Sequence, residues 1–504
     1  MEFDSRTVVV EESGGLSRET NWWGAFVIGL AGTILVIPLV GFALGALGGF
    51  AVVLFVVLTL VGVFLCFCLA EMAALWPDRA GGLPSYAFET FKPLGSTAAK
   101  HIGGLSSWGY WLGWFTVAPI NAFLAAAYFT ALLKIDFGGS FGPIHEKFGI
   151  AIPVDVFVVA ILFLVIMFIP CWLGIRLGAT FATVLGIGSI IPLVLLIIIP
   201  FFKPSAIDLG NLDGFSLPTG VSASFGLILG WAFIYTWTVL AMEAAACYIG
   251  ECREPVRDAK IALTAEGLFG LFVYTALPIM VLAVLGQEAI AKLGIDAAVV
   301  FNGYIDAIFG TSTFWNWFVN ITIIAALLLS VLNALMGASR GLYQNAHDGI
   351  LPKAFGWKNK HSAPSFAMLF SLVFSVGILC IGQILQIYIF SNMGYLFAVA
   401  LSLIGYGIFR STQDSVEREL RMPVWMGPVG LILGIALLIL WAVGGWYATQ
   451  YAVGTGYDWH GLPTLFLIGL ILLLLYFPLN WWRNMEDRSD KGMAVSPSAE
   501  GASG

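Results

Sequence analysis

Between Lys360 and Arg410, 49 consecutive residues carry no Asp, Glu, Lys or Arg side chain. A helix that crosses a membrane needs about 20 apolar residues, so this run is too long for one span and must turn. We expect the turn near Gln383–Gln386. Similar runs recur along the 504 residues, of which 59% are hydrophobic and only 11% charged. A soluble domain carries about 25% charged residues. The sequence therefore predicts an all-α polytopic membrane protein and excludes a soluble enzyme or a nucleic-acid-binding protein.

Hydropathy divides the chain into twelve expected transmembrane helices, near 22–47, 50–76, 104–133, 153–174, 177–202, 222–249, 263–286, 313–339, 364–384, 388–410, 424–447 and 460–482. If the N-terminus is cytoplasmic, 19 of the 23 Lys and Arg residues lie on the cytoplasmic side. Positive residues are enriched in cytoplasmic loops, so both termini are predicted to be cytoplasmic. The polar segments 1–21 and 486–504 are predicted to be disordered tails.

No motif for enzymatic chemistry accompanies the spans. The chain has no zinc-ligand spacing, no phosphate-binding glycine loop and no nucleophile elbow, and its six cysteines suit packing in or beside apolar runs. We therefore expect a protein that is not an enzyme, with no catalytic residue, no metal, no cofactor and no nucleic-acid partner. The expected partners are the lipid bilayer and a small molecule.

Polar groups inside the spans are candidates for function, because each one is costly in hydrocarbon. Glu243 is the clearest, since no charged residue occurs from Gly214 to Met242, whereas Glu266 lies near the inner start of the seventh span and Glu71 near the inner end of the second. Glu243 could bind a ligand or a proton, act in a gate, or hold helices together. The neutral candidates, for which an interhelical hydrogen bond is the simpler interpretation, include Thr33, Asn121, Ser189, Thr238, Ser330 and Asn333.

Two of the predicted helices have interrupted sequences. The first contains G-L-A-G-T at 29–33 and then Pro38 and Gly41, and the sixth contains a polar cluster at 235–238 before Glu243. Discontinuous helices leave backbone N–H and C=O groups free, which is tolerated at membrane depth only where these groups line a cavity. The first and sixth positions suit a five-plus-five inverted repeat. Close helix packing is the other interpretation of the glycines.

Three stretches together resemble the amino acid–polyamine–organocation permeases. The first, at 71–87, contains E-M-A-A-L-W-P, then G-G and a tyrosine. The second comprises Glu243 and E-C-R-E-P at 251–255, and the third comprises S-R-G-L-Y at 339–343 and D-G-I-L-P at 348–352. Their order and spacing agree with the family across residues 22–410, whereas the last two spans have no signature of their own.

The resemblance implies a LeuT-type fold with a first repeat over 22–202, an inverted second repeat over 222–410 and two extra helices over 424–482. It implies broken helices 1 and 6, with the substrate held between them. It also implies a secondary active transporter that moves amino acids or related small amines across the plasma membrane by alternating access. The expected substrate-binding positions are Ala31, Gly32, Thr33, Trp237, Thr238, Ala241 and Asn121.

The family pattern also gives expected roles. The N–H groups of the first break meet the substrate's carboxylate, and Trp237 covers the substrate, six positions before Glu243. The expected coupling or gating residues are Glu243, Ser189, Ser330 and Asn333.

The chain departs from the family at three places. It has A-G-T-I at 31–34 where Gly-Ser-Gly-Ile is usual, A-M-E at 241–243 where Gly-Phe-Glu is usual, and Ser189 where many members carry a lysine. Three coupling mechanisms therefore remain open. Either Na⁺ binds near Thr33 and Ser330, or Glu243 exchanges a proton, or the protein is an uncoupled exchanger.

Other function classes are weighed against this one. The same fold could carry another small metabolite, such as a polyamine, a nucleobase or an organic cation. A channel would need a continuous polar stripe, and a non-transporting sensor would need an output domain. A carrier of the major facilitator type would need a long central loop, but the connection at 250–262 is short.

Overall fold

The computed structural model describes residues 15–141, 152–293, 297–380, 384–413, 415–450, 458–459 and 462–494. Its α-helices are α1 (Trp22–Ile34), α2 (Val36–Leu47), α3 (Phe50–Leu75), α4 (Leu83–Thr90), α5 (Ser96–Phe115), α6 (Val117–Leu133), α8 (Val154–Trp172), α9 (Ile175–Ile198), α10 (Phe225–Val239), α11 (Pro255–Leu285), α12 (Gln287–Leu293), α13 (Ala297–Phe309), α14 (Thr313–His347), α15 (Ser365–Leu379), α16 (Ile384–Thr412), α17 (Met426–Ala448), α18 (Thr464–Leu474) and α19 (Tyr476–Ala494).

Short elements join these helices. The 3₁₀ helices are η1 (Lys92–Leu94), η2 (Ile199–Phe202), η3 (Pro204–Ala206), η4 (Leu209–Phe215), η5 (Leu240–Glu251) and η6 (Lys353–Gly356). Two antiparallel strand pairs complete the described structure, β1 (Ser140–Phe141) with β2 (Ile152–Pro153) and β3 (Asp458–Trp459) with β4 (Leu462–Pro463).

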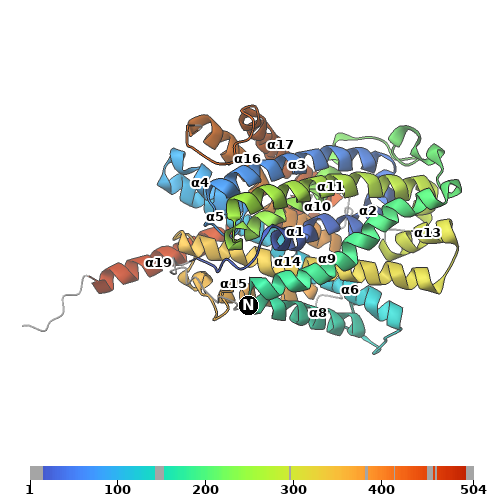
Figure 1. The fold of residues 1–504 in the computed structure, drawn as a ribbon, viewed down its shortest axis with the longest axis horizontal. Coiled ribbons are helices and arrows are strands. Elements are labelled where there is room, and N and C mark those ends of the chain that lie inside the picture. The colour runs from blue at the N-terminus through green and yellow to red at the C-terminus, as the bar shows by residue number, and fades with distance from the viewer. Residues whose placement is uncertain are drawn as a thin grey trace, which may run out of the picture.

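The long helices run along the longest axis of the bundle (Figure 1). One end of the bundle holds the first described residues, α4 and α19, and the opposite end holds α13. The end with the first described residues is called the N-terminal end below. The protein is therefore an all-helical bundle with two clearly distinct ends.

Eleven described helical stretches are long and apolar enough to cross a membrane. They match eleven of the twelve predicted spans, so the prediction of a multi-pass helical membrane protein is confirmed. The remaining predicted span, at 364–384, contains α15, which has only 15 residues. Helix α15 ends at Leu379 and α16 begins at Ile384, so residues 384–386 of the expected turn are helical, whereas residues 381–383 lie outside the described part of the chain. The exact count of twelve stays a prediction.

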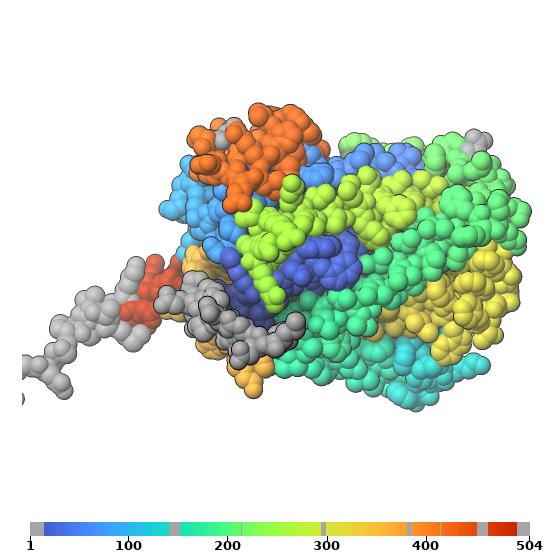
Figure 2. Space-filling model, viewed as in Figure 1, coloured from blue at the N-terminus to red at the C-terminus, as the bar shows by residue number. Residues whose placement is uncertain are grey.

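The first span forms the centre of the bundle. In its most apolar window 94% of the residues are buried, against 33% for Met426–Ala448 and 28% for Thr464–Asp490. On one face of the molecule α1 lies between α11 and α9 (Figure 2). The last two spans are therefore peripheral helices whose apolar surface faces outward.

Prolines interrupt two of the spans. A single residue, Leu35, separates α1 from α2 three positions before Pro38, and another single residue separates α5 from α6 three positions before Pro119. Proline has no N–H, and its ring clashes with the carbonyl four residues earlier. The carbonyl that Pro119 leaves free belongs to Phe115, and it accepts a hydrogen bond from Ser375 Oγ at 3.2 Å.

The sixth span changes helix type rather than unwinding. It is α-helical as α10 and continues from Leu240 to Glu251 as the 3₁₀ helix η5. The first span is likewise interrupted by one residue only. Broken helices with free backbone groups in these two spans therefore stay a prediction.

The two predicted tails need correction where the structure describes them. Helix α19 continues to Ala494, although the sequence predicts a disordered tail from residue 486. Polar contacts hold this end: Glu486 Oε2 accepts from the backbone N–H of Lys353 at 2.9 Å, and the Lys353 ammonium pairs with Asp490. At the other end, residues 15–21 are ordered on the bundle. Residues 1–14 and 495–504 lie outside the described residues.

Candidate functional site

Helix α1 and the 3₁₀ helix η5 cross in direct backbone contact at two glycines. A Cβ atom on Gly32 would overlap the carbonyl oxygen of Ala241, and one on Gly29 would come within 2.5 Å of the backbone nitrogen of Ala245. Small residues allow helices to approach this closely inside a membrane. In this conformation the glycines of α1 therefore serve close packing, and the crossing is closed.

Two hydroxyl groups from neighbouring helices meet backbone carbonyls at this crossing. The Tyr274 hydroxyl of α11 lies 3.1 Å from the Gly32 oxygen and 2.8 Å from the Thr238 oxygen. The Ser330 hydroxyl of α14 lies 3.1 Å from the Ala31 oxygen. Backbone groups at membrane depth must be satisfied within the protein, and here side chains do this for α1 and α10.

Trp237 joins three helices beside the crossing. Its indole N–H donates to the Gly113 oxygen of α5 at 3.2 Å, and its ring meets the Tyr388 ring of α16 edge-on, with 4.4 Å between centroids. The side chain is almost wholly buried. Trp237 therefore ties α10 to α5 and α16 in this structure.

Glu243 is fully buried and is held by tyrosines. Its Oε1 accepts from the Tyr110 hydroxyl at 3.1 Å and from the Tyr395 hydroxyl at 3.2 Å. The Tyr110 hydroxyl also lies 3.0 Å from Cys247 Sγ. Among the described residues no Lys, Arg or His side chain contacts this carboxyl group. Glu243 therefore ties η5 to α5 and α16 through hydrogen bonds without a countercharge.

A second buried carboxyl group, Glu266 of α11, reaches the crossing itself. Its Oε2 accepts from the backbone N–H of Ala245 at 2.9 Å. Its Oε1 occupies the place that a side chain on Gly29 would take, and it has no hydrogen-bond partner. Glu266 therefore lies between α1 and η5, one turn away from the contact of Gly32 with Ala241.

The remaining predicted site residues hydrogen-bond locally or are left with free polar atoms. Asn121 Nδ2 donates to the Val117 oxygen at 2.8 Å, and Ser189 Oγ to the Leu185 oxygen at 2.6 Å. Asn333 Oδ1 accepts a hydrogen bond from the Tyr248 hydroxyl, and Tyr248 is not one of the predicted site residues. The buried atoms of the predicted set that have no partner are Thr33 Oγ1, Asn121 Oδ1 and Asn333 Nδ2.

The structure thus gathers part of the predicted set. Contacts at the crossing join Gly32 to Ala241, Ala31 to Ser330, and Thr238 to α1 through Tyr274. Asn121 and Ser189 make no hydrogen bond to any of the other predicted residues. The predicted set of site residues includes neither the tyrosines at 110, 274 and 395 nor Glu266, although the sequence marks Glu266 as an ionisable group near the start of the seventh span. Each tyrosine carries a polar group inside an apolar span, which is the signal that could have found it.

The three sequence stretches that flank the spans meet at the N-terminal end. Arg79 from the first stretch pairs with Glu89 at 2.7 Å and with Asp348 from the third stretch. Arg340 from the third stretch forms a buried pair with Glu251 from the second, with a second contact at 3.0 Å. Burial raises the pKa of the Asp348 carboxyl, while Arg79 opposes that shift. This end of the bundle is therefore closed by ion pairs between distant segments.

Glu71 belongs to a separate buried ion cluster. Its carboxylate contacts Arg410 at 2.8 Å, Arg418 at 2.9 Å and the Tyr406 hydroxyl at 2.6 Å. The charge of Glu71 is thus balanced within the protein, in contrast to Glu243.

The ordered segment Gly15–Asn21 ties the start of α1 to the end of η5. The Thr20 N–H donates to the Glu251 oxygen at 3.1 Å, and the Arg253 N–H donates back to the Thr20 oxygen at 3.1 Å, around Cys252. Two residues before Thr20, the chain also pairs with the loop after α3 through Arg18 and Asp78. The segment therefore covers the N-terminal end as a strap.

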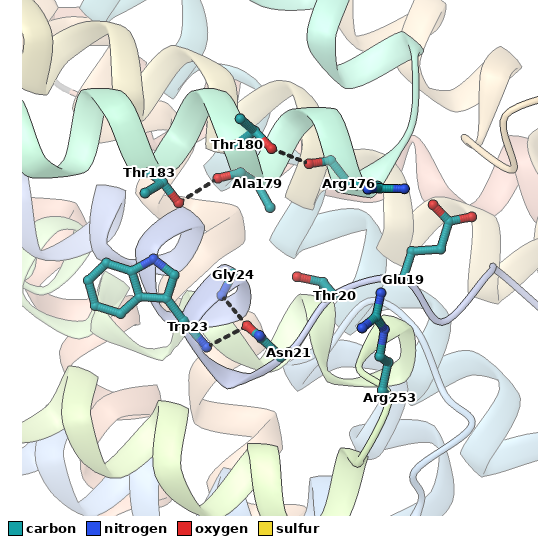
Figure 3. Close-up of a pocket in the computed structure, with 10 residues that line it drawn as sticks. All are labelled: Glu19, Thr20, Asn21, Trp23, Gly24, Arg176, Ala179, Thr180, Thr183 and Arg253. Atoms are coloured by element: carbon teal, nitrogen blue, oxygen red, sulfur yellow. Dashed lines mark hydrogen bonds between the residues drawn. The ribbon is translucent and has the colours of Figure 1, made fainter. Parts of the chain in front are cut away.

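A polar hollow opens beside this strap, between the start of α1 and α9 (Figure 3). Glu19, Arg176 and Arg253 gather on one side of it, and Trp23 lies on the other (Figure 3). Asn21 Oδ1 accepts from the N–H groups of residues 23 and 24, both at 3.1 Å, so these N–H groups at the start of α1 are already capped. The hollow is a surface feature, one to two turns of α1 away from the crossing.

Comparisons with known proteins agree with this architecture. A family model described as amino acid permease matches residues 21–475. A Clostridium perfringens protein provisionally named an amino-acid transporter is 25% identical over 316 residues, or 60% of this chain and 59% of that protein. The arginine/agmatine antiporter of Chlamydia abortus is 27% identical over 63% of this chain and 62% of its own length. The L-lysine transport protein of Corynebacterium glutamicum is 25% identical over 54% of this chain and 51% of its own. The chain thus spans less than two thirds of each of these relatives.

Proposed function

Because this chain belongs to the amino acid permease family, we propose that it is a secondary active transporter that carries amino acids or related small amines across the plasma membrane by alternating access. The observation that supports this best is the closed crossing of α1 and η5. It joins the first and sixth spans in the middle of the bundle, where carbonyl groups are held by hydroxyl groups of other helices.

The proposed fold has twelve spans, with α15 as the ninth, arranged as two inverted repeats of five and two extra helices. The peripheral position of α17 to α19 supports a separate role for the last two spans. The termini are proposed to be cytoplasmic, which makes the N-terminal end the inner end. Transporters of this kind bind their substrates at discontinuous helices near the middle of the membrane.

We propose that the substrate binds when α1 and η5 move apart. Tyr274 and Ser330 would then leave the oxygens of Gly32, Thr238 and Ala31, and these oxygens would accept from the substrate's amine. The N–H groups of residues 31–33 would receive its carboxylate. The unpaired polar atoms of Thr33, Asn121 and Asn333 are further donors or acceptors near these spans.

Basic amino acids and their amines are the first substrates to test. The names of two relatives refer to arginine, agmatine and lysine. In addition, Glu243 and Glu266 are buried carboxyl groups without a basic partner among the described residues, which suits a cationic ligand or a proton. Neutral amino acids, polyamines, nucleobases and other organic cations follow as alternatives. An uncoupled exchanger and a non-transporting sensor are the other classes to exclude.

Uptake by purified protein in liposomes tests the proposal. We expect a radiolabelled amino acid to accumulate and an ionophore to abolish the accumulation. Trp237→Ala should lower uptake about tenfold or more, since it removes the ring that packs on Tyr388, whereas Trp237→Phe should retain part of the activity. The matched control is Trp481→Ala, because that side chain is 65% exposed on α19. Unchanged uptake by Trp237→Ala would remove the site, and accumulation of an unrelated solute alone would remove the substrate class.

A further inference from the structure

We propose that Glu266 is a proton-binding residue that couples protonation to closure of the crossing between α1 and η5. The inference rests on the transport function proposed above and assigns its coupling ion. Glu266 is one of the buried carboxyl groups of the spans, and among those that the structure describes it is the one that lies between the two helices expected to move.

The contacts of Glu266 place its carboxyl group between two backbones. Oε2 accepts from the Ala245 N–H of η5 at 2.9 Å, and Oε1 packs against α1 at Gly29. Any side chain at position 29 would displace the carboxyl group. The surroundings of the Glu266 carboxyl group therefore depend on whether α1 packs against η5.

In the described part of the chain, no positively charged side chain lies against Glu266 to balance a carboxylate. The residues of α1 carry no titratable side chain at all. Among the described residues, the titratable groups facing it are Glu243 and Cys247 of η5 and Cys66 of α3, and each of these groups is neutral or negative, never positive. The free energy of burying an unpaired carboxylate among such groups is far higher than that of burying a neutral carboxylic acid. The closed crossing therefore favours the protonated form of Glu266.

A proton fits this site better than a metal ion. Among the described residues no group of three or more His, Cys, Asp or Glu side chains is placed to hold a metal. The nearby carbonyls of Ala31 and Gly32 already face Ser330 and Tyr274. A proton needs no further oxygen ligands and no space between Oε1 and α1.

Opening of the N-terminal end would release this proton. Helix α11 begins at Pro255, directly after the strap contact at 251–253, so Glu266 lies three turns from that end. When α1 leaves η5, water reaches the carboxyl group and ionises it. Proton binding then favours closure, and a ligand or ion that binds one conformer better shifts the population toward that conformer.

The first experiment detects the proton directly, without transport. Infrared difference spectra of the purified wild type and Glu266→Gln should show, at neutral pH, a carboxylic-acid C=O band that is missing in the variant. Glu243→Gln should not remove the same band, and Glu288→Gln, at an exposed position of α12, serves as the control. An identical band in the wild type and in Glu266→Gln would overturn the proposal.

The second experiment measures coupling in liposomes. Accumulation driven by an inward pH gradient should fall about tenfold in Glu266→Gln, within the range typical of coupling between sites, and Glu266→Asp should restore part of it. Accumulation by Glu266→Gln that still follows the pH gradient as in the wild type would overturn the proposal. If the wild type carries no amino acid or amine, the proposed function fails, whereas the infrared band still decides whether Glu266 holds a proton. If Glu266→Gln does not fold, a pH titration of the band in the wild type and in Glu266→Asp decides the question.

Discussion

The hydroxyl oxygen of Tyr274 in α11 lies 3.1 Å from the carbonyl oxygen of Gly32 in α1. It is also 2.8 Å from the carbonyl oxygen of Thr238 in α10. One side chain thus joins the first, sixth and seventh spans at the depth where α1 and η5 cross. In the proposed transport cycle, this contact has to break when α1 and η5 move apart.

Replacement of Tyr274 by Phe should destabilise the closed protein modestly and change transport more strongly. The ring stays in place, but the two carbonyl oxygens lose the one hydroxyl proton that they share, at a cost of about 1 kcal/mol for a hydrogen bond in a membrane protein. We expect a lower unfolding temperature in detergent and a changed apparent affinity for substrate. Tyr304→Phe is the matched control, because its hydroxyl donates to the Leu196 oxygen at 2.7 Å on α9, outside the crossing. Equal effects of both variants on uptake would contradict the role of Tyr274.

A methyl group at Gly32 should prevent the crossing from closing. Its Cβ would overlap the Ala241 carbonyl, and overpacking of this kind costs about 1–3 kcal/mol or more. We expect Gly32→Ala to fold with lower thermal stability and to lose uptake about tenfold, since 1.4 kcal/mol corresponds to a factor of about ten. Gly377→Ala in α15 is the control, since nothing lies within 4 Å of its Cβ position. Normal uptake by Gly32→Ala would mean that the contact is not part of the cycle.

The buried ion pair of Arg340 with Glu251 should depend on both partners. Removal of one partner of a buried pair leaves an unpaired charge and costs about 3–5 kcal/mol. Arg340→Leu should therefore lower the unfolding temperature strongly, and the double variant with Glu251→Leu should recover most of the loss. Arg257→Ala, which breaks an exposed pair with Glu254, should leave the unfolding temperature unchanged. A double variant as unstable as Arg340→Leu alone would show that packing, rather than the unpaired charge, sets the effect.

The strap should control the reactivity of Cys252. This thiol is fully buried beside Thr20, and burial raises its pKa, so the reactive thiolate is scarce at neutral pH. Thr20→Pro removes the N–H that donates to the Glu251 oxygen. In a background without the other cysteines, we expect this variant to react with a maleimide several times faster. Ser17→Ala, which removes only a hydroxyl contact to Ser362, should leave the rate unchanged. Equal rates in all three proteins would show that the strap does not shield Cys252.

Hydropathy alone places most of the spans, because long charge-free runs have few alternatives in a membrane. The predicted 22–47 coincides with Trp22–Leu47, and the predicted 424–447 lies within one or two residues of α17. The chain ends were harder to predict. Residues 486–494 form helix because Glu486 and Asp490 contact Lys353, a partner more than 130 positions away that local composition cannot reveal.

The candidate site was predictable only in part. Glycines at 29 and 32 mark the crossing, but sequence cannot say whether they pack or bind in a given conformation. Tyr274 escaped prediction because its ring suits an apolar span and its partners are backbone carbonyls, which have no sequence signature. Glu266 is recognisable in the sequence as an ionisable group near the start of the seventh span, but only the packing of α11 shows that it lies against α1.

The depth at which the first span is buried sets an order for assembly. Its window is 94% buried, yet η5, α11 and α14, which cover it, are all translated later. When α1 enters the membrane, its glycine-bearing face is therefore not yet covered by the helices that bury it in the folded protein. The pairing of Thr20 with Glu251 and Arg253 likewise forms only after the sixth span has crossed. Packing of α1 against η5 is thus a late step of biogenesis. Variants at Gly29 or Gly32 should therefore also reduce the yield of assembled protein.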